Sequence, residues 1–67
     1  MADNSLIDPI VAALQAGNPQ LAEQHCRAAL GRAPDEPDVL VLLALGLQQQ
    51  DRYQDALAVF ARLVEVC

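Results

Sequence analysis

The chain has 67 residues, a net charge of −5, and 54% hydrophobic but only 3% aromatic residues. Its four basic residues are all arginines and nine acids oppose them, so binding to nucleic acid or to an anionic membrane is not expected. A chain this short forms one domain at most, which we assign to residues 1–67. The apolar mass is Ala, Leu and Val. Ala and Leu are strong helix formers, so the composition predicts an all-α fold.

The first predicted helix ends at Gly17 and Asn18, a pair typical of a helix C-terminus. Two starts remain open. Ser5 followed three residues later by Asp8 resembles a capping box. Alternatively, Asp8 is the N-cap and Pro9 occupies the first helical position. The two alternatives differ by about one helical turn.

The second predicted helix begins with Asn18 as N-cap and Pro19 at the first helical position. Gly31 weakens its end, and Pro34 closes it. The apolar residues between these points have the spacing of one helical face. They are Leu21, Ala22, Cys26, Ala29 and Leu30.

The third predicted helix runs from about Glu36 to Gln49, and the fourth begins near Tyr53 and continues to the end of the chain. The turn between them falls at Asp51 and Arg52, where the Arg52 side chain can pair with Asp55 or Asp51. All the connections are short, and short connections make successive helices antiparallel. The sequence therefore predicts two stacked helical hairpins.

The two predicted hairpins repeat with a period of 34 residues. Ala22 and Ala56 lie 34 residues apart, as do Cys26 and Phe60. The turn Gly17–Asn18–Pro19 stands in the same register with Asp51–Arg52–Tyr53. A fixed period of this length indicates a repeat architecture.

This helix–turn–helix period resembles the tetratricopeptide repeat family. In the second repeat the family's pattern is represented by Leu40, Leu43, Ala44, Leu47, Ala56 and Phe60. Pro34 ends the first repeat where the family has a proline, whereas Leu40 replaces its Trp and Ala44 its Gly. The resemblance implies two antiparallel hairpins stacked as a short right-handed solenoid, with repeat one at about residues 3–34 and repeat two at about 37–67. It further implies a protein-interaction module that is not an enzyme and has no cofactor.

Two repeats leave the C-terminal hairpin with more apolar side chains than the first hairpin can cover. About three repeats are generally needed for stability. We therefore expect self-association, as a dimer or higher oligomer, through Leu57, Val64 and Val66. The alternative is that the chain is the N-terminal part of a longer protein, such as a regulatory segment of an enzyme. A pure homo-oligomerisation unit with no other ligand is a further alternative.

The resemblance also implies a concave groove that binds a protein or peptide and is lined by the first helix of each repeat. The candidate partner-binding residues are Ile7, Val11, Val41, Leu42, Leu45, Gln48 and Gln49. They suggest a groove for an apolar peptide. The chain contains no Lys, so the carboxylate clamp found in some family members is absent. The alternative is that an oligomer contact or another domain covers these residues.

No catalytic, cofactor or metal site is expected. His25 and Cys26 are adjacent, but neighbours on a helix point about 100° apart and cannot serve one site. We expect His25 at the surface and Cys26 buried as a small hydrophobe. Two cysteines do not form the framework of a secreted scaffold, and the acidic start MADNS is unlike a secretory signal. The expected location is cytoplasmic, with no membrane partner.

Overall fold

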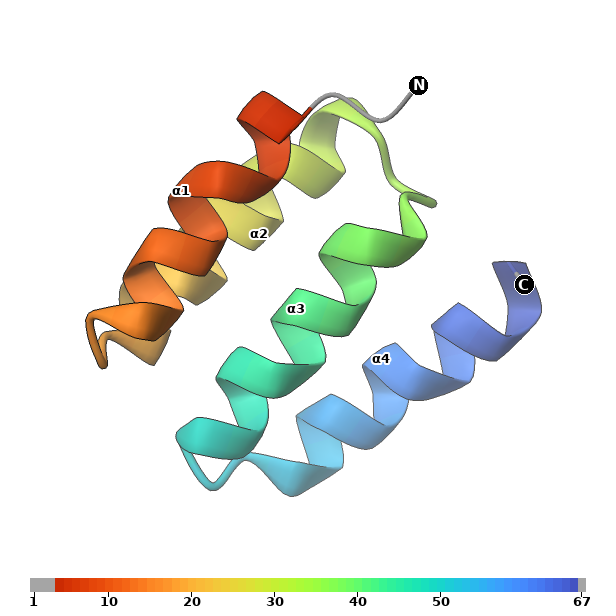
Figure 1. The fold of residues 1–67 in the computed structure, drawn as a ribbon. Coiled ribbons are helices and arrows are strands. Elements are labelled where there is room, and N and C mark those ends of the chain that lie inside the picture. Colours follow the sequence, from red (N-terminus) through yellow and green to blue (C-terminus); the bar gives the residue numbers. More distant parts are fainter. Residues whose placement is uncertain (1–3, 67) are drawn as a thin grey trace.

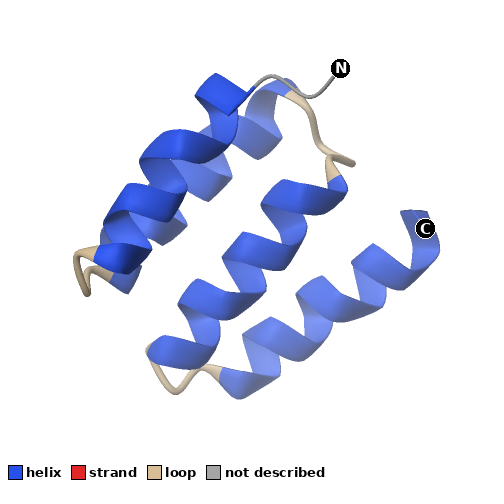
Figure 2. Cartoon of the chain, viewed as in Figure 1, coloured by secondary structure: helices blue, strands red, loops and turns tan. Residues whose placement is uncertain are grey.

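The computed structural model describes residues 4–66, which form four α-helices joined by short turns (Figures 1 and 2). The helices are α1 (Asn4–Gln15), α2 (Pro19–Arg32), α3 (Pro37–Gln49) and α4 (Tyr53–Val66). No strand occurs within residues 4–66, so the all-α prediction is confirmed. Each helix runs antiparallel to the one before it, and the helices pair as the hairpins α1–α2 and α3–α4.

The four helices form two layers. In Figure 1, α1 and α3 lie side by side towards the viewer, and α2 lies behind α1. Helix α3 packs against the other three helices. Within residues 4–66, the backbone of α4 comes close to that of α3 and to no other helix. The last helix therefore has a packed face towards α3 and a face that no other helix covers.

The two hairpin turns share one backbone geometry, 34 residues apart. Gly17 has a φ of 75° and Asp51 a φ of 60°, and both end a helix in the left-handed conformation. In the first turn the amides of Gly17 and Asn18 donate to the carbonyls of Leu14 and Ala13; in the second, the amides of Asp51 and Arg52 donate to those of Gln48 and Leu47. This double pattern is the Schellman motif. The structure therefore confirms the predicted register between the turns.

The helix starts agree with the sequence in α2 but not in α1. The side chain of Asn18 accepts a hydrogen bond from the amide of Leu21 at 3.2 Å, as expected of an N-cap. Helix α1, in contrast, begins at Asn4, so the two predicted caps, Ser5 and Asp8, were both wrong. Pro9 lies inside α1 rather than at its first position. Local capping signals occurred twice in this segment, and the helix extends through both of them.

The core lies between the two hairpins and is built largely from small side chains. Its buried hydrophobic residues are Ile10, Ala13, Ala22, Cys26, Ala29, Val39, Leu40, Leu43, Ala44, Leu47 and Ala56. A Cβ added at Gly46 would lie 3.5 Å from the Pro19 carbonyl oxygen and 4.0 Å from the Ala22 Cβ, so α2 and α3 approach closely there. Phe60, expected beneath the paired helices, is half-buried against this core.

Candidate protein-interaction surfaces

Helix α3 presents an apolar ridge of exposed side chains. Val41 and Leu45 are 39% and 40% exposed and lie one turn apart, and Gln48 and Gln49 continue the exposed surface. Leu42, also predicted for this surface, is half-buried and packs against the core. The ridge therefore has two accessible apolar side chains followed by two amides.

The predicted groove residues on α1 are less accessible. Ile7 and Val11 are both half-buried on α1, which packs beside α3. The structure thus brings the predicted groove residues onto neighbouring helices, but Ile7 and Val11 offer only part of their side chains to a partner.

A second apolar surface, the α4 stripe, runs along the uncovered face of α4. It consists of Tyr53, Leu57 and Val64, which are 58%, 66% and 77% exposed. Val66, which was also predicted for an oligomer interface, is half-buried and therefore less exposed than Leu57 and Val64. The sequence prediction missed Tyr53, although its position four residues before Leu57 places it on the same helical face.

A polar cluster joins the two hairpins, and the sequence did not predict it. The carboxylate of Glu23 on α2 accepts hydrogen bonds from Arg27 at 2.8 Å, from the Gln50 amide at 3.0 Å and from Arg52 at 2.7 Å. Arg52 also pairs with Asp55, one of its two predicted partners. Gln50 and Arg52 lie 27 and 29 residues beyond Glu23, so the contact ties α2 to the turn between α3 and α4.

The electrostatics of this cluster favour the ionised form of Glu23. Burial of the carboxyl group raises its pKa. The hydrogen bonds from Gln50 and Arg27 and the positive charges of Arg52 and Arg27 outweigh burial, so the pKa of Glu23 lies below its ordinary value. The carboxylate is therefore held charged at neutral pH by groups on both hairpins.

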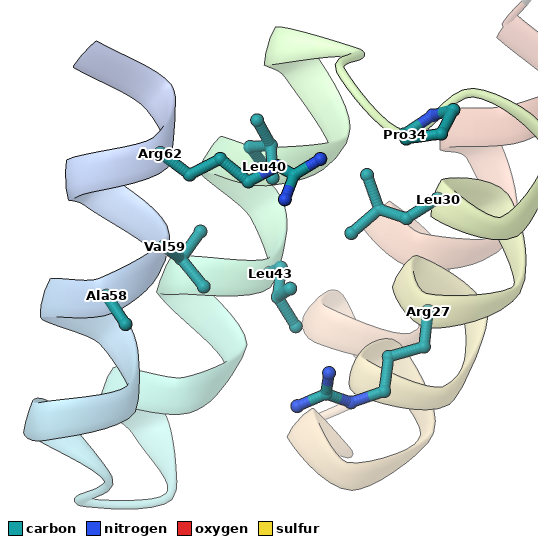
Figure 3. Close-up of a pocket in the computed structure, with 8 residues that line it drawn as sticks. All are labelled: Arg27, Leu30, Pro34, Leu40, Leu43, Ala58, Val59 and Arg62. Atoms are coloured by element: carbon teal, nitrogen blue, oxygen red, sulfur yellow. The ribbon is translucent and has the colours of Figure 1, made fainter. Parts of the chain in front are cut away.

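A cleft opens between α2, α3 and α4, on the side of α3 away from the ridge (Figure 3). Its volume is about 310 Å³. The lining residues are Arg27, Leu30, Pro34, Leu40, Leu43, Ala58, Val59 and Arg62. Leu43 in the cleft and Leu45 on the ridge are two residues apart, which separates them by roughly 200° around the helix. We call this hollow the α2–α4 cleft.

His25 and Cys26 do not form a site. Cys26 is fully buried, as expected, and burial raises the pKa of its thiol to about 11. A thiol with that pKa is almost entirely protonated at neutral pH and is a poor nucleophile. His25 is half-buried rather than at the surface. Within residues 4–66 no group of three or more His, Cys, Asp or Glu side chains is placed to hold a metal ion.

Comparison with known proteins identifies the repeat. The family model for the tetratricopeptide repeat matches residues 13–66, which include the end of α1 and all of α2, α3 and α4. The chain belongs to the tetratricopeptide repeat family. Searches of the curated proteins and of the solved structures found no significant match.

Membership of the tetratricopeptide repeat family explains the small residues in the core. Ala22 and Ala56, at equivalent positions of the two repeats, are both buried. Tetratricopeptide repeats are scaffolds for protein–protein interaction and typically carry no catalytic activity. None of the described helices is long and apolar enough to span a membrane. The ridge of α3, the α4 stripe and the α2–α4 cleft are therefore its candidate docking surfaces.

Proposed function

We propose that this tetratricopeptide chain is a protein-interaction module that self-associates through the α4 stripe. The observation that carries the proposal is the exposure of Leu57 and Val64 on a helix whose backbone packs against α3 alone. Burying one large aliphatic side chain contributes about 1.5–3 kcal/mol. A two-fold contact would bury the stripe against its own copy, because such an interface uses the same patch twice.

Sedimentation velocity tests self-association. We expect the wild-type chain to sediment as a dimer or higher oligomer at roughly micromolar concentrations, and the double variant Leu57→Asp, Val64→Asp to sediment as a monomer. Both side chains are exposed, so the helical circular dichroism spectrum should be unchanged. Ala58→Asp is the matched control, because Ala58 is exposed on α4 but lies about 100° or more around the helix from Leu57 and Val64. A wild-type monomer at about 100 µM would contradict the proposal, since that concentration captures even weak dimers.

A second candidate function is supported by the exposed ridge of α3. Val41 and Leu45 offer two exposed apolar side chains on α3, which packs beside α1. An apolar peptide laid along the ridge would contact both, with Gln48 and Gln49 at its edge. The cytoplasmic location is also a proposal, which the low cysteine content supports, because two cysteines do not form the disulfide framework of a small secreted domain.

Selection from a displayed peptide library tests the ridge. We expect apolar peptides that bind the wild-type chain to lose binding to Val41→Asp and Leu45→Asp, while sedimentation of these variants is unchanged. If binding and oligomerisation are lost together, the ridge serves assembly and the chain is a pure homo-oligomerisation unit. Selected peptides that bind the variants as well as the wild type would exclude the ridge as their site.

A further inference from the structure

The α2–α4 cleft has an apolar interior between two guanidinium groups. Figure 3 shows Leu30, Leu43 and Val59 pointing into the hollow. Arg27 from α2 and Arg62 from α4 reach in at different levels of it. The floor residues Leu40 and Leu43 are buried, whereas Leu30 and Val59 are half-buried and accessible to a ligand.

The two charged residues that line this cleft are both arginines, and each also pairs with an acid outside the lining, Arg27 with Glu23 and Arg62 with Asp35. The chain has a net charge of −5 and only four basic residues, yet two of the four line this cleft. No carboxylate is among its lining residues. The α4 stripe, in contrast, shares its helix with the exposed acids Asp55 and Glu65. Within residues 4–66, the cleft thus combines accessible apolar walls with two guanidinium groups, which become available to a ligand if they leave these acids.

Both arginines can exchange their present partners at low cost. Arg62 pairs with Asp35 at 3.1 Å, and both side chains are more than half exposed. Exposed ion pairs of this kind contribute about 0–1 kcal/mol. Arg27 pairs with Glu23, but Glu23 would keep Gln50 and Arg52 if Arg27 turned to a ligand. Neither exchange leaves a buried charge without a partner.

We propose that the α2–α4 cleft docks an acidic amphipathic helix from another protein. The apolar face of that helix packs on Leu30 and Val59, and carboxylates on either side of it pair with Arg27 and Arg62. The mode is helix-in-groove recognition, in which apolar anchors recur at helical spacing. This surface lies outside the α4 stripe and the ridge, so the proposal does not depend on the function proposed above.

Three designed peptides test the proposal by fluorescence anisotropy. The probe is an acetylated, amidated helix of about 15 residues with Leu at i, i+3 and i+4 spacing and Glu on both flanks. The second peptide replaces each Glu by Lys, and the third replaces each Leu by Ala. We expect the Glu–Leu peptide to bind about tenfold more tightly than either of the others. The net charge of −5 would by itself favour the Lys peptide, so the expected order isolates the local charge of the cleft.

Variants locate the binding. Arg27→Gln with Arg62→Gln should weaken the Glu–Leu peptide about tenfold. Ala58→Glu, which adds a negative charge at the exposed rim of the cleft, should do the same. Arg32→Gln is the matched control, because Arg32 is exposed on α2 but does not line the cleft. The variant with Leu57→Asp and Val64→Asp should bind the Glu–Leu peptide as tightly as the wild-type chain does, whether or not the wild-type chain is an oligomer.

Several results would overturn the proposal. One is equal or tighter binding of the Lys peptide. Another is an effect of Arg32→Gln as large as that of the double arginine variant. A third uses dodecanoate, a fatty-acid anion, as a small probe that has an apolar chain and one carboxylate. If dodecanoate binds and the Glu–Leu peptide does not, the cleft takes a small anionic amphiphile instead of a helix. Circular dichroism of each variant confirms that any loss of binding occurs in a folded chain.

Discussion

At the scale of single residues, Glu23 is the polar group that joins the hairpins. Its carboxylate receives hydrogen bonds from α2 itself and from the turn between α3 and α4. Its pKa lies below the ordinary value of 4.5 in the folded chain. A lowered pKa means that the ionised group stabilises the fold above the unfolded-state pKa. This stabilisation is lost as the pH falls through the lower folded-state pKa.

Replacing the carboxylate should therefore have a pH-dependent cost. We expect Glu23→Gln to lower the free energy of unfolding by about 1 kcal/mol at neutral pH, because two arginines lose a charged acceptor. The difference from wild type should narrow in acid, as the pH falls through the lowered pKa of Glu23 and the wild-type group also becomes neutral. Urea unfolding at neutral and at acid pH measures this.

Glu65→Gln provides the control for this experiment. Glu65 is exposed near the end of α4, and its substitution should change stability by less than about 0.5 kcal/mol. A loss for Glu23→Gln that is the same at both pH values would contradict an electrostatic role and indicate a packing effect.

At the scale of elements, the two hairpin turns have the same geometry but different residues at the left-handed position. Gly17 adopts this conformation without a steric penalty, whereas Asp51 carries a Cβ there. Such a conformation costs an L-residue about 1–2 kcal/mol, somewhat less for Asp. The second turn therefore stores strain that the first does not.

Removing the glycine of the first turn and introducing one in the second should change the stability of the fold in opposite directions. Gly17→Ala should destabilise the chain by about 1 kcal/mol, and Asp51→Gly should stabilise it by up to about the same amount. Thermal unfolding measures both. Asp51 accepts a hydrogen bond from the Tyr53 hydroxyl, which raises the pKa of Tyr53. Asp51→Gly should therefore also lower the pKa of Tyr53 in a spectrophotometric titration. If Asp51→Gly instead destabilises the chain, the contacts of the Asp51 side chain outweigh the strain of its backbone.

The sequence predicted the elements because their signals are local. Asn18 and Gly17 marked helix ends within two residues of the observed ones, and the 34-residue period placed Ala22 and Ala56 in the core. The start of α1 was wrong because two adjacent segments carried capping residues. The contacts of Glu23 with Gln50 and Arg52 span 27 and 29 residues, and the α2–α4 cleft is lined by α2 and α4, which all of α3 separates in the chain. Side-chain pairings at that separation follow from helix packing, which periodicity does not specify.

At the scale of the whole molecule, stability should be uneven along the chain. Helix α3 packs against all three other helices, whereas α4 packs against α3 alone. Regions with fewer buried contacts have a lower free energy of local unfolding, so their amide hydrogens exchange faster. We expect amide hydrogen exchange to be slowest in α3 and faster in α4.

Exchange measured at two protein concentrations also tests self-association. If the α4 stripe forms the interface, protection of α4 should increase with concentration while that of α1 stays constant. Equal protection of α3 and α4 at the lowest concentration would contradict the one-sided packing of α4.

The Glu23 cluster also makes the contact between the two hairpins specific to their order. The position equivalent to Glu23 in the second hairpin is Leu57, and the positions equivalent to Gln50 and Arg52 in the first turn are Ala16 and Asn18. Reversing the order of the hairpins would place a leucine beside an alanine and an asparagine, with no ion pair. Ala22 and Ala56 are buried at equivalent positions of the two repeats, whereas the charged contact has no equivalent. The Glu23 cluster therefore distinguishes the first hairpin from the second.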